Sequence, residues 1–290
     1  MSRPFLSGKG TDITGWRRKR GIAMDIRMIV LDLDGTLLTS QNTLTERTVR
    51  AVTACIRQGI TVTVATGRVF HSVLPFARKL GITDALITAN GAEIRAPRDK
   101  DPLYYRPIER KLAREVLAFF REKGWYIQVY LGDRLFVDEV DERAKSYGRL
   151  TFLEPEPLGE ELYTMYVEPV KLLSIASSPE EAVSVRKAVQ KRFGDAIYAA
   201  VSNRLFVDMA HPKVSKARGL EILMEKQGVT PLQTMVVGDS ENDLPLFEHA
   251  GFSVAMGNAR EEIRKKADTV TLSNDEDGAA VALDRFALKG

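Results

Sequence analysis

The sequence predicts an α/β fold in which a parallel sheet carries helices on both faces and a second, α+β domain is inserted into it. Short apolar, β-branched runs alternate with amphipathic helical segments at the start of the chain and again at its end. Such alternation with short links is typical of a parallel sheet with right-handed crossovers. Between residues 93 and 209 the order changes to hairpins and paired strands. The 290 residues are enough for two modest domains.

The first half of the predicted sheet domain, residues 25–107, begins with the run Ile29–Leu31. This run is apolar and too short for a helix, so it predicts a strand buried on both faces. Further elements are expected at residues 45–58 (a helix ended by Gly59), 60–64 (strand), a helix ending at Leu80, 85–88 (a third strand of the same sheet), and a hairpin at 93–96 and 103–106.

The inserted domain is expected at residues 108–208, about 100 residues, which is a typical domain size. Its predicted helices are 108–123, 140–147 and one opening after Ser178, and its predicted strands are 126–131, 134–138, 171–176, 196–201 and 204–209. The sheet domain resumes in residues 209–290, with helices at 216–227, 244–250 and 260–266 and strands at 234–237, 252–255 and 269–272.

Charge is concentrated in the first residues of the chain. Residues 1–25 carry a net +4, whereas the whole chain carries +3, so the remainder is close to neutral. A basic face for nucleic acid therefore has little support. We expect residues 1–24 to be a disordered tail, or an upstream extension of a reading frame that starts at Met24. The lone Cys55 fits a reducing cytoplasm, and no apolar run is long enough to span a bilayer.

Two aspartates mark the end of the first strand. Asp32 and Asp34 are separated by Leu33 and followed by Gly35 and Thr36. Clustered carboxylates at a buried strand end repel one another and resist desolvation, and a divalent cation would remove that cost. Asp32 is the candidate nucleophile, because a carboxylate that attacks phosphorus splits hydrolysis into two easier steps. Asp34 points to the same side and can act as general acid and base.

Three further candidates follow later strands or open helices. Thr66 and the Gly67 amide are expected at a helix N-terminus, which is a ready site for phosphate oxygens. Arg68 could face the phosphate, face the inserted domain, or have a structural role in the loop. Lys216 opens a helix, where a cation is unfavourable against the helix dipole. An ion pair with Asp32 and a phosphoryl group would explain it, although a solvated surface lysine is the common case.

A second acidic cluster, Gly238-Asp239-Ser240-Glu241-Asn242-Asp243, follows the predicted strand at 234–237. Asp239 and Asp243 add oxygen ligands, or acceptors behind the ligands, to the Asp32 cluster. Hard oxygens without His or Cys nearby favour Mg²⁺ as cofactor.

Together these motifs resemble the haloacid dehalogenase (HAD) superfamily of phosphohydrolases. The large insertion between the second and third motifs is similar to the Cof-type, class IIB members, which have a Rossmann-like core with an inserted α/β cap domain. The strings around Asn90, Asn258 and Asp277 are also like that subfamily. One departure is Ala217, where many relatives have glycine after the lysine.

The resemblance implies a role for each matching residue. Asp32 would be nucleophile and Mg²⁺ ligand, and Asp34 the acid/base with its backbone carbonyl on the metal. Asp239 would be a further Mg²⁺ ligand, and Asp243 would stand behind it and hold Lys216. Phosphate-binding residues would be Thr66, Gly67, Lys216 and Asn242.

The expected activity is Mg²⁺-dependent hydrolysis of small phosphomonoesters, such as sugar phosphates, flavin or pyridoxal phosphates, or nucleotides. A phosphosugar mutase and a metabolite-binding module without turnover are the alternatives. The expected partner is a small phosphorylated metabolite rather than nucleic acid or a membrane, and the protein is expected to be a monomer or a homodimer.

Overall fold

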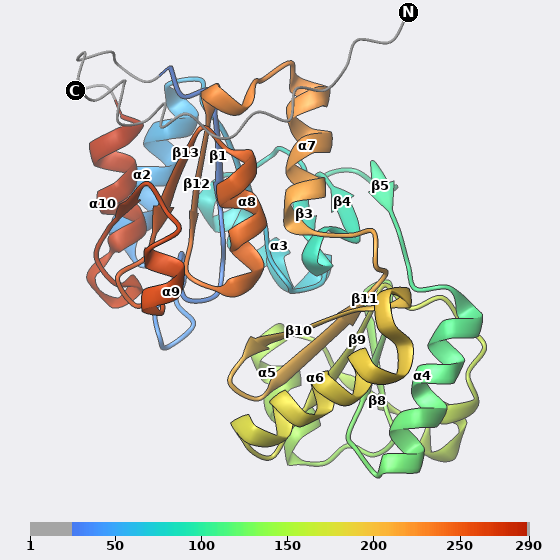
Figure 1. The fold of residues 1–290 in the computed structure, drawn as a ribbon. Helices are drawn as coiled ribbons and strands as arrows, with labels where there is room; N and C mark the ends of the chain where they lie inside the picture. The colour runs from blue at the N-terminus through green and yellow to red at the C-terminus, as the bar shows by residue number, and fades with distance from the viewer. Residues whose placement is uncertain (1–24, 289–290) are drawn as a thin grey trace, which may run out of the picture.

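Five parallel strands form the central sheet of the computed structural model, which describes residues 25–288 (Figure 1). Their order is β14-β13-β12-β1-β2. Their bounds are Met28–Leu31 (β1), Thr61–Val64 (β2), Thr234–Gly238 (β12), Phe252–Ala255 (β13) and Thr269–Val270 (β14). Leu31 lies opposite both Val64 and Val237, so three neighbouring strands end at one edge of the sheet. The predictions for residues 1–24 lie outside the described residues.

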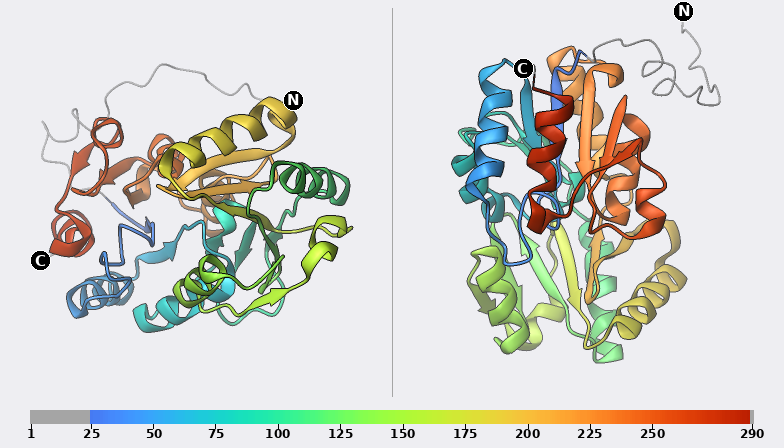
Figure 2. Two further views of the ribbon diagram at one scale, coloured as in Figure 1. Left: turned by 90° about the horizontal axis from the view of Figure 1, so that it is seen from below. Right: turned by 90° about the vertical axis from the view of Figure 1, so that its left-hand side faces the viewer.

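Helices cover both faces of this sheet, as predicted. One face packs on α2 (Glu46–Arg57), α3 (Phe70–Leu80) and α10 (Gly278–Phe286), and the other on α7 (Lys216–Gln227), α8 (Leu244–His249) and α9 (Glu261–Arg264) (Figures 1 and 2). An apolar core lies on each face of the sheet, and alternate residues of β1 contribute to each. Ile29 and Leu31 belong to one core, and Met28 and Val30 belong to the other. The strand is therefore buried on both faces.

The third predicted strand forms beside β2, but its main pairing differs from the prediction. β3 (Leu86–Thr88) forms an antiparallel sheet with β4 (Glu93–Arg95) and β5 (Tyr104–Tyr105), and a single parallel bridge between Ala65 and Ile87 joins it to β2. The cause is a tight reversal at Asn90 and Gly91, which have φ of 56° and 95°. The reversal folds the chain back along the edge of β3 that faces away from β2, so β3 pairs in parallel on one edge and antiparallel on the other.

A second body begins with α4 (Arg110–Lys123) and contains a six-stranded sheet of order β10-β11-β9-β6-β7-β8. We call the body from α4 to β11, residues 110–210, the cap. Its strands are β6 (Gln128–Leu131), β7 (Arg134–Val137), β8 (Pro155–Pro157), β9 (Lys171–Ile175), β10 (Tyr198–Asn203) and β11 (Phe206–Ala210). The sequence did not predict β8; it is an edge strand, where proline is tolerated.

The two faces of the cap sheet differ. Helices α4 and α6 (Pro179–Phe193) pack on one face through an apolar cluster that includes Leu172 and Val207. The opposite face, with α5 (Glu142–Thr151), shares another apolar cluster with Val69 and Ala89 of the sheet domain. The cap therefore turns one sheet face toward the carboxyl edge of the central sheet (Figure 2). The domain boundaries at 107/108 and 208/209 stay predictions.

Short 3₁₀ turns complete the chain at Ala89–Gly91, Gly159–Thr164, Gly194–Ala196, Pro231–Gln233, Glu241–Asp243 and Asn274–Glu276. Across residues 25–288, none of the helices is both long and apolar enough to cross a membrane.

Candidate active site

Lys216 lies buried between two carboxylates at the carboxyl edge of the central sheet. Its ammonium group donates to Asp32 Oδ1 at 2.5 Å and to Asp243 Oδ1 at 2.7 Å. Ser215 caps the helix by accepting from the Arg218 amide, so the helix begins at Lys216, as predicted. Burial opposes the charge on Lys216, but the two carboxylates outweigh it and raise the pKa of the ammonium. Lys216 is therefore a buried cation and not a solvated surface lysine.

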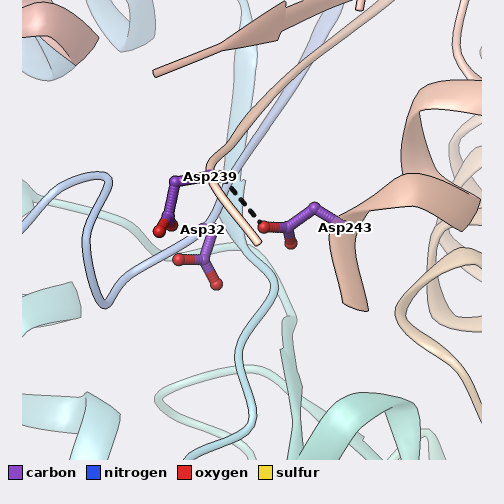
Figure 3. A group of neighbouring side chains, drawn as sticks. All are labelled: Asp32, Asp239 and Asp243. Atoms are coloured by element: carbon purple, nitrogen blue, oxygen red, sulfur yellow. Dashed lines mark hydrogen bonds between the residues drawn. The ribbon is translucent and has the colours of Figure 1, made fainter. Parts of the chain in front are cut away.

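Asp239 completes the acidic cluster from the next strand. Oxygen atoms of Asp32, Asp239 and Asp243 lie within 4.8 Å of one another (Figure 3). Thr36 donates to Asp239 Oδ1 at 3.0 Å. Gly35 makes room for this approach: its φ is +81°, and a Cβ there would stand 2.6 Å from Asp239 Oδ2.

The carboxylates of the cluster are engaged to different extents. Asp243 uses both oxygens, because its Oδ2 accepts from the amides of Asp239 and Ser240, each at 3.1 Å. Among the described residues, Asp32 is held through Oδ1 and Asp239 through Oδ1, which leaves the second oxygen of each without a protein donor. These two side chains, rather than Asp243, can therefore offer oxygens to a cation.

The cluster holds more negative charge than Lys216 balances. Burial raises the pKa of Asp239 to about 7, and the Asp243 charge adds to the effect. Burial likewise raises the pKa of Asp32 well above its usual range, against the pull of Lys216. Buried carboxylates with raised pKa values are typical of functional sites and of sites that take up a cation. The group contains no His or Cys and offers hard oxygens, so it fits a divalent cation such as Mg²⁺.

Thr66, Gly67 and Arg68 lie beside this cluster, but not at the helix start that the sequence predicted. Helix α3 begins at Phe70 with Val69 as its N-cap, so the three residues form the loop before it. Thr66 is held by hydrogen bonds of its backbone and its side chain. Its amide donates to Ile87 O at 2.9 Å, and its hydroxyl accepts from the Arg68 amide at 3.1 Å. The helix begins late because Thr66 and Arg68 first bond to the β3 hairpin at 87–90.

Arg68 connects Asp34 to the cap. Its guanidinium donates from Nε to Asp34 Oδ2 at 2.9 Å and from Nη2 to Asp34 Oδ1 at 2.5 Å. Its Nη1 donates to Leu150 O of the cap at 2.9 Å, and Nη2 also reaches Asn42 Oδ1 at 3.2 Å. Of the three alternatives for Arg68, the structure therefore places it toward the inserted domain, with its fork on Asp34.

A cavity of about 660 Å³ separates the acidic cluster from the cap. From the sheet domain it is lined by Asp32, Asp34, Thr66, Gly67, Arg68, Asp239 and Asn242, whereas Asp243 and Lys216 lie behind this wall. Asn242 is oriented by a bond from its amide to Asn90 Oδ1 at 3.1 Å. Of the other two strings, Asn258 lines the cavity and donates to Gly35 O. Asp277 accepts a hydrogen bond from Thr45, the N-cap of α2.

The cap side of the cavity carries charged residues that the sequence did not single out. Lys171 and Asp208 form a buried ion pair there, and Lys171 donates to Gly67 O at 2.8 Å. Both lie in predicted strands. A charged residue among apolar strand residues was the feature of the sequence that could have indicated them as site residues.

Comparison with known proteins agrees with this architecture. Residues 29–283 match the sequence profile of the haloacid dehalogenase-like hydrolases. The chain is 30% identical to phosphatase YwpJ of Bacillus subtilis over 88% of its length and 98% of the relative's. It is 27% identical to the 5-amino-6-(5-phospho-D-ribitylamino)uracil phosphatase YwtE of the same organism, over 90% and 98% of the two chains.

A solved structure shares the whole fold. A haloacid dehalogenase-like hydrolase from Bacteroides thetaiotaomicron superposes with a TM-score of 0.81 at 28% identity, covering 90% of this chain and 99% of the other. The alignment spans sheet domain and cap together, and the phosphatase-named relatives agree with the buried acidic cluster at the sheet edge. The chain therefore belongs to the haloacid dehalogenase-like hydrolases and is a phosphatase that acts on phosphoric monoesters.

Proposed function

We propose that the chain is a Mg²⁺-dependent phosphatase of small phosphomonoesters that works through an aspartyl-phosphate on Asp32. The observation that carries the proposal is the pairing of Asp32, which lines the cavity, with Lys216, which lies behind it. Asp32 keeps one oxygen directed to no protein donor among the described residues, while Lys216 holds the other at 2.5 Å. A fixed carboxylate with a free oxygen is suited to attack phosphorus.

In the proposed reaction Asp32 forms a bond to phosphorus and the ester oxygen leaves. Asp34 gives that oxygen its proton, so the alcohol departs neutral. Asp34 then takes a proton from water, which attacks phosphorus, breaks the bond to Asp32 and releases inorganic phosphate. Lys216, Thr66, the Gly67 amide and Asn242 hold the phosphoryl oxygens, because phosphoryl transfer depends mainly on positioning and charge neutralisation.

The proposed metal ligands are Asp32, Asp239 and the Asp34 backbone carbonyl, with Asp243 behind them. Both oxygens of Asp243 are engaged, which supports the outer position for it. Bound Mg²⁺ would supply charge neutralisation for the phosphoryl group and the carboxylates. Asp243 meanwhile keeps Lys216 pointed at Asp32, and Thr36 keeps Asp239 in place.

Small esters of sugars or polyols, flavin or pyridoxal phosphates and nucleotides are the proposed substrates. The cavity volume of about 660 Å³ is in the range of small-molecule sites. The relative named for an ester of a phosphoribityl chain supports hydroxylated substrates in particular.

The test is phosphate release with Mg²⁺ from a panel of phosphorylated metabolites by the wild type and by Asp32→Asn. The variant should lose about 10⁴-fold or more in kcat, as expected for removal of a nucleophile. Asn keeps the size of the side chain and Asp243 still balances Lys216, so circular dichroism should show a folded protein. Asp195→Asn, at an exposed site of the cap, is the matched control.

Absence of release from every ester by folded, Mg²⁺-loaded wild type would contradict the proposal. Retention of the phosphoryl group on a product would instead identify the mutase alternative.

A further inference from the structure

Two buried charges of the cap face the cavity and take no part in the proposed chemistry. Lys171 of β9 and Asp208 of β11 are 3% and 2% exposed and form an ion pair. In the antiparallel register Asp208 lies opposite Leu173, so Lys171 is its diagonal neighbour on the same sheet face. That face is the one turned toward the sheet domain. The helix-covered face of the same strands is apolar, with Leu172 and Val207.

Such a pair is unfavourable as a purely structural device. Taking two charges out of water costs more than their attraction returns unless hydrogen bonds satisfy the remaining valences. Here they are incompletely satisfied. The Lys171 ammonium contacts Asp208 Oδ1 and donates to Gly67 O, which leaves its third N–H unused. Among residues 25–288, no protein donor reaches the other carboxylate oxygen of Asp208, Oδ2. A buried carboxylate and ammonium with unused valences therefore line a cavity.

The pair also lies close to the expected position of the phosphoryl group. Lys171 bonds to the carbonyl of Gly67, in the loop proposed to hold phosphate. Burial opposes the charge on Lys171, but the Asp208 carboxylate outweighs it and raises the pKa of the ammonium, with a smaller contribution from the Asp34 charge. When an ester is bound, the groups that contact Lys171 and Asp208 would therefore be those of its alcohol part, close to the ester oxygen.

We propose that Lys171 and Asp208 recognise hydroxyl groups on the alcohol of the substrate, next to the phosphoester bond, and so select polyol and sugar phosphates. This inference rests on the proposed phosphatase function. A hydroxyl can donate to Asp208 and accept from Lys171 at once, which satisfies both unused valences. A second anionic group on the substrate would be repelled by the Asp208 carboxylate. A cationic group would be repelled by Lys171 and Arg68. An apolar alcohol would leave both charges desolvated and without a new partner.

The test compares two esters that differ in their hydroxyls alone, glycerol 3-phosphate and n-propyl phosphate. Wild type should prefer the glycerol ester by about tenfold or more in kcat/KM, because a site built for a hydroxyl rejects analogues that lack it. Replacing both charges, Lys171→Met with Asp208→Val, should preserve folding, since removal of a whole buried pair is often neutral. The preference should then fall to about twofold or less by the same hydrogen-bond argument.

Arg134→Gln with Glu156→Gln removes an exposed ion pair of the same cap and is the matched control, with the preference retained. If the double replacement at 171 and 208 does not fold, Asp208→Asn gives the same ratio test with side-chain size preserved.

Different failures are distinguishable. Equal preference in the wild type and the double replacement would assign the pair a structural role and overturn the inference alone. So would a wild type that hydrolyses both esters equally well. No release of phosphate from any ester would overturn the proposed function and the inference with it.

Discussion

Two buried lysines lie on opposite sides of the cavity, and their surroundings differ in charge balance. Lys171 is part of the cavity lining on the cap side, whereas Lys216 lies behind the wall on the sheet-domain side. Lys216, from the sheet domain, stands against Asp32 and Asp243, with Asp239 close behind. Lys171, from the cap, forms its ion pair with one carboxylate of the described residues, Asp208, and donates to the neutral carbonyl of Gly67. The first group has an excess of negative charge, and the second is neutral as a pair.

This difference separates chemistry from recognition. An anionic cluster with raised carboxyl pKa values attracts a divalent cation, and with it a phosphoryl group. A neutral pair attracts no counter-ion, but it offers one strong acceptor and one strong donor to an uncharged polar group. The sheet domain therefore suits the part of a phosphomonoester that all substrates share, and the cap suits the part that varies.

The largest expected difference between the two regions comes from removing each lysine. Lys216→Met leaves Asp32 and Asp243 buried without their cation, so the free energy of unfolding should fall by about 3–5 kcal/mol. The rate of phosphate release should fall by about 10³-fold or more, because the nucleophile and the phosphoryl group both lose a positive charge. Denaturant unfolding and phosphate release measure the two effects.

Lys171→Met is the matched variant in the cap. It also leaves one buried carboxylate uncompensated, so its stability loss should be of similar order, about 3 kcal/mol. Its kcat/KM toward a hydroxylated ester should fall by about tenfold, the value of one hydrogen bond to a charged group. Equal losses of activity in the two variants would contradict the division between the regions.

A smaller effect is expected from pH and metal. The pKa of Asp239, about 7 in the fold, exceeds its unfolded value, so the native state holds more protons between about pH 4 and pH 7. Without metal, stability should therefore fall as pH rises through this window and level off above it. Mg²⁺ displaces that proton, so its affinity should rise by up to about tenfold per pH unit below about 7.

Thermal unfolding with and without Mg²⁺ at a series of pH values checks this prediction. At a concentration one hundred times Kd, the metal should add about 2.7 kcal/mol to stability. Asp239→Asn should weaken the Mg²⁺ response and reduce the pH dependence, whereas Asp208→Asn in the cap should preserve both. A Mg²⁺ response that survives in Asp239→Asn would place the cation elsewhere.

The sheet-domain cluster was accessible to sequence reasoning because it depends on strand ends alone. Parallel strands of one sheet end at the same edge, so acids after Leu31 and after Gly238 must meet there whatever the details of packing. Lys216 followed from an unfavourable charge at a helix start. These arguments require the order of strands and helices along the chain but not the pairing register of the strands. The sequence could therefore predict that Asp32, Lys216 and Asp239 lie close together.

The cap pair and the β3 hairpin depend on information that the sequence pattern does not carry. Lys171 and Asp208 meet only in the observed register of β9 and β11, and a slip of one residue would put Asp208 on the helix-covered face. The partner of Arg68 in the cap is the backbone carbonyl of Leu150, which any residue would supply. β3 pairs with β2 on one edge and with β4 on the other, and the β4 pairing depends on the left-handed backbone at Asn90 and Gly91, which the hydrophobic pattern does not reveal.

The smallest expected effect concerns Arg68, which belongs to both regions. Its fork holds both oxygens of Asp34 and its third nitrogen reaches the cap at Leu150 O, so it ties the proposed acid to the cap position. Arg68→Lys keeps the charge but loses the fork, and kcat should fall by about three- to tenfold with KM little changed, because a guanidinium fork and an ammonium group are not equivalent at a bidentate site. Steady-state kinetics on one ester separates the two constants. A rise in KM with kcat unchanged would instead indicate that Arg68 binds the phosphate of the substrate and does not act through Asp34.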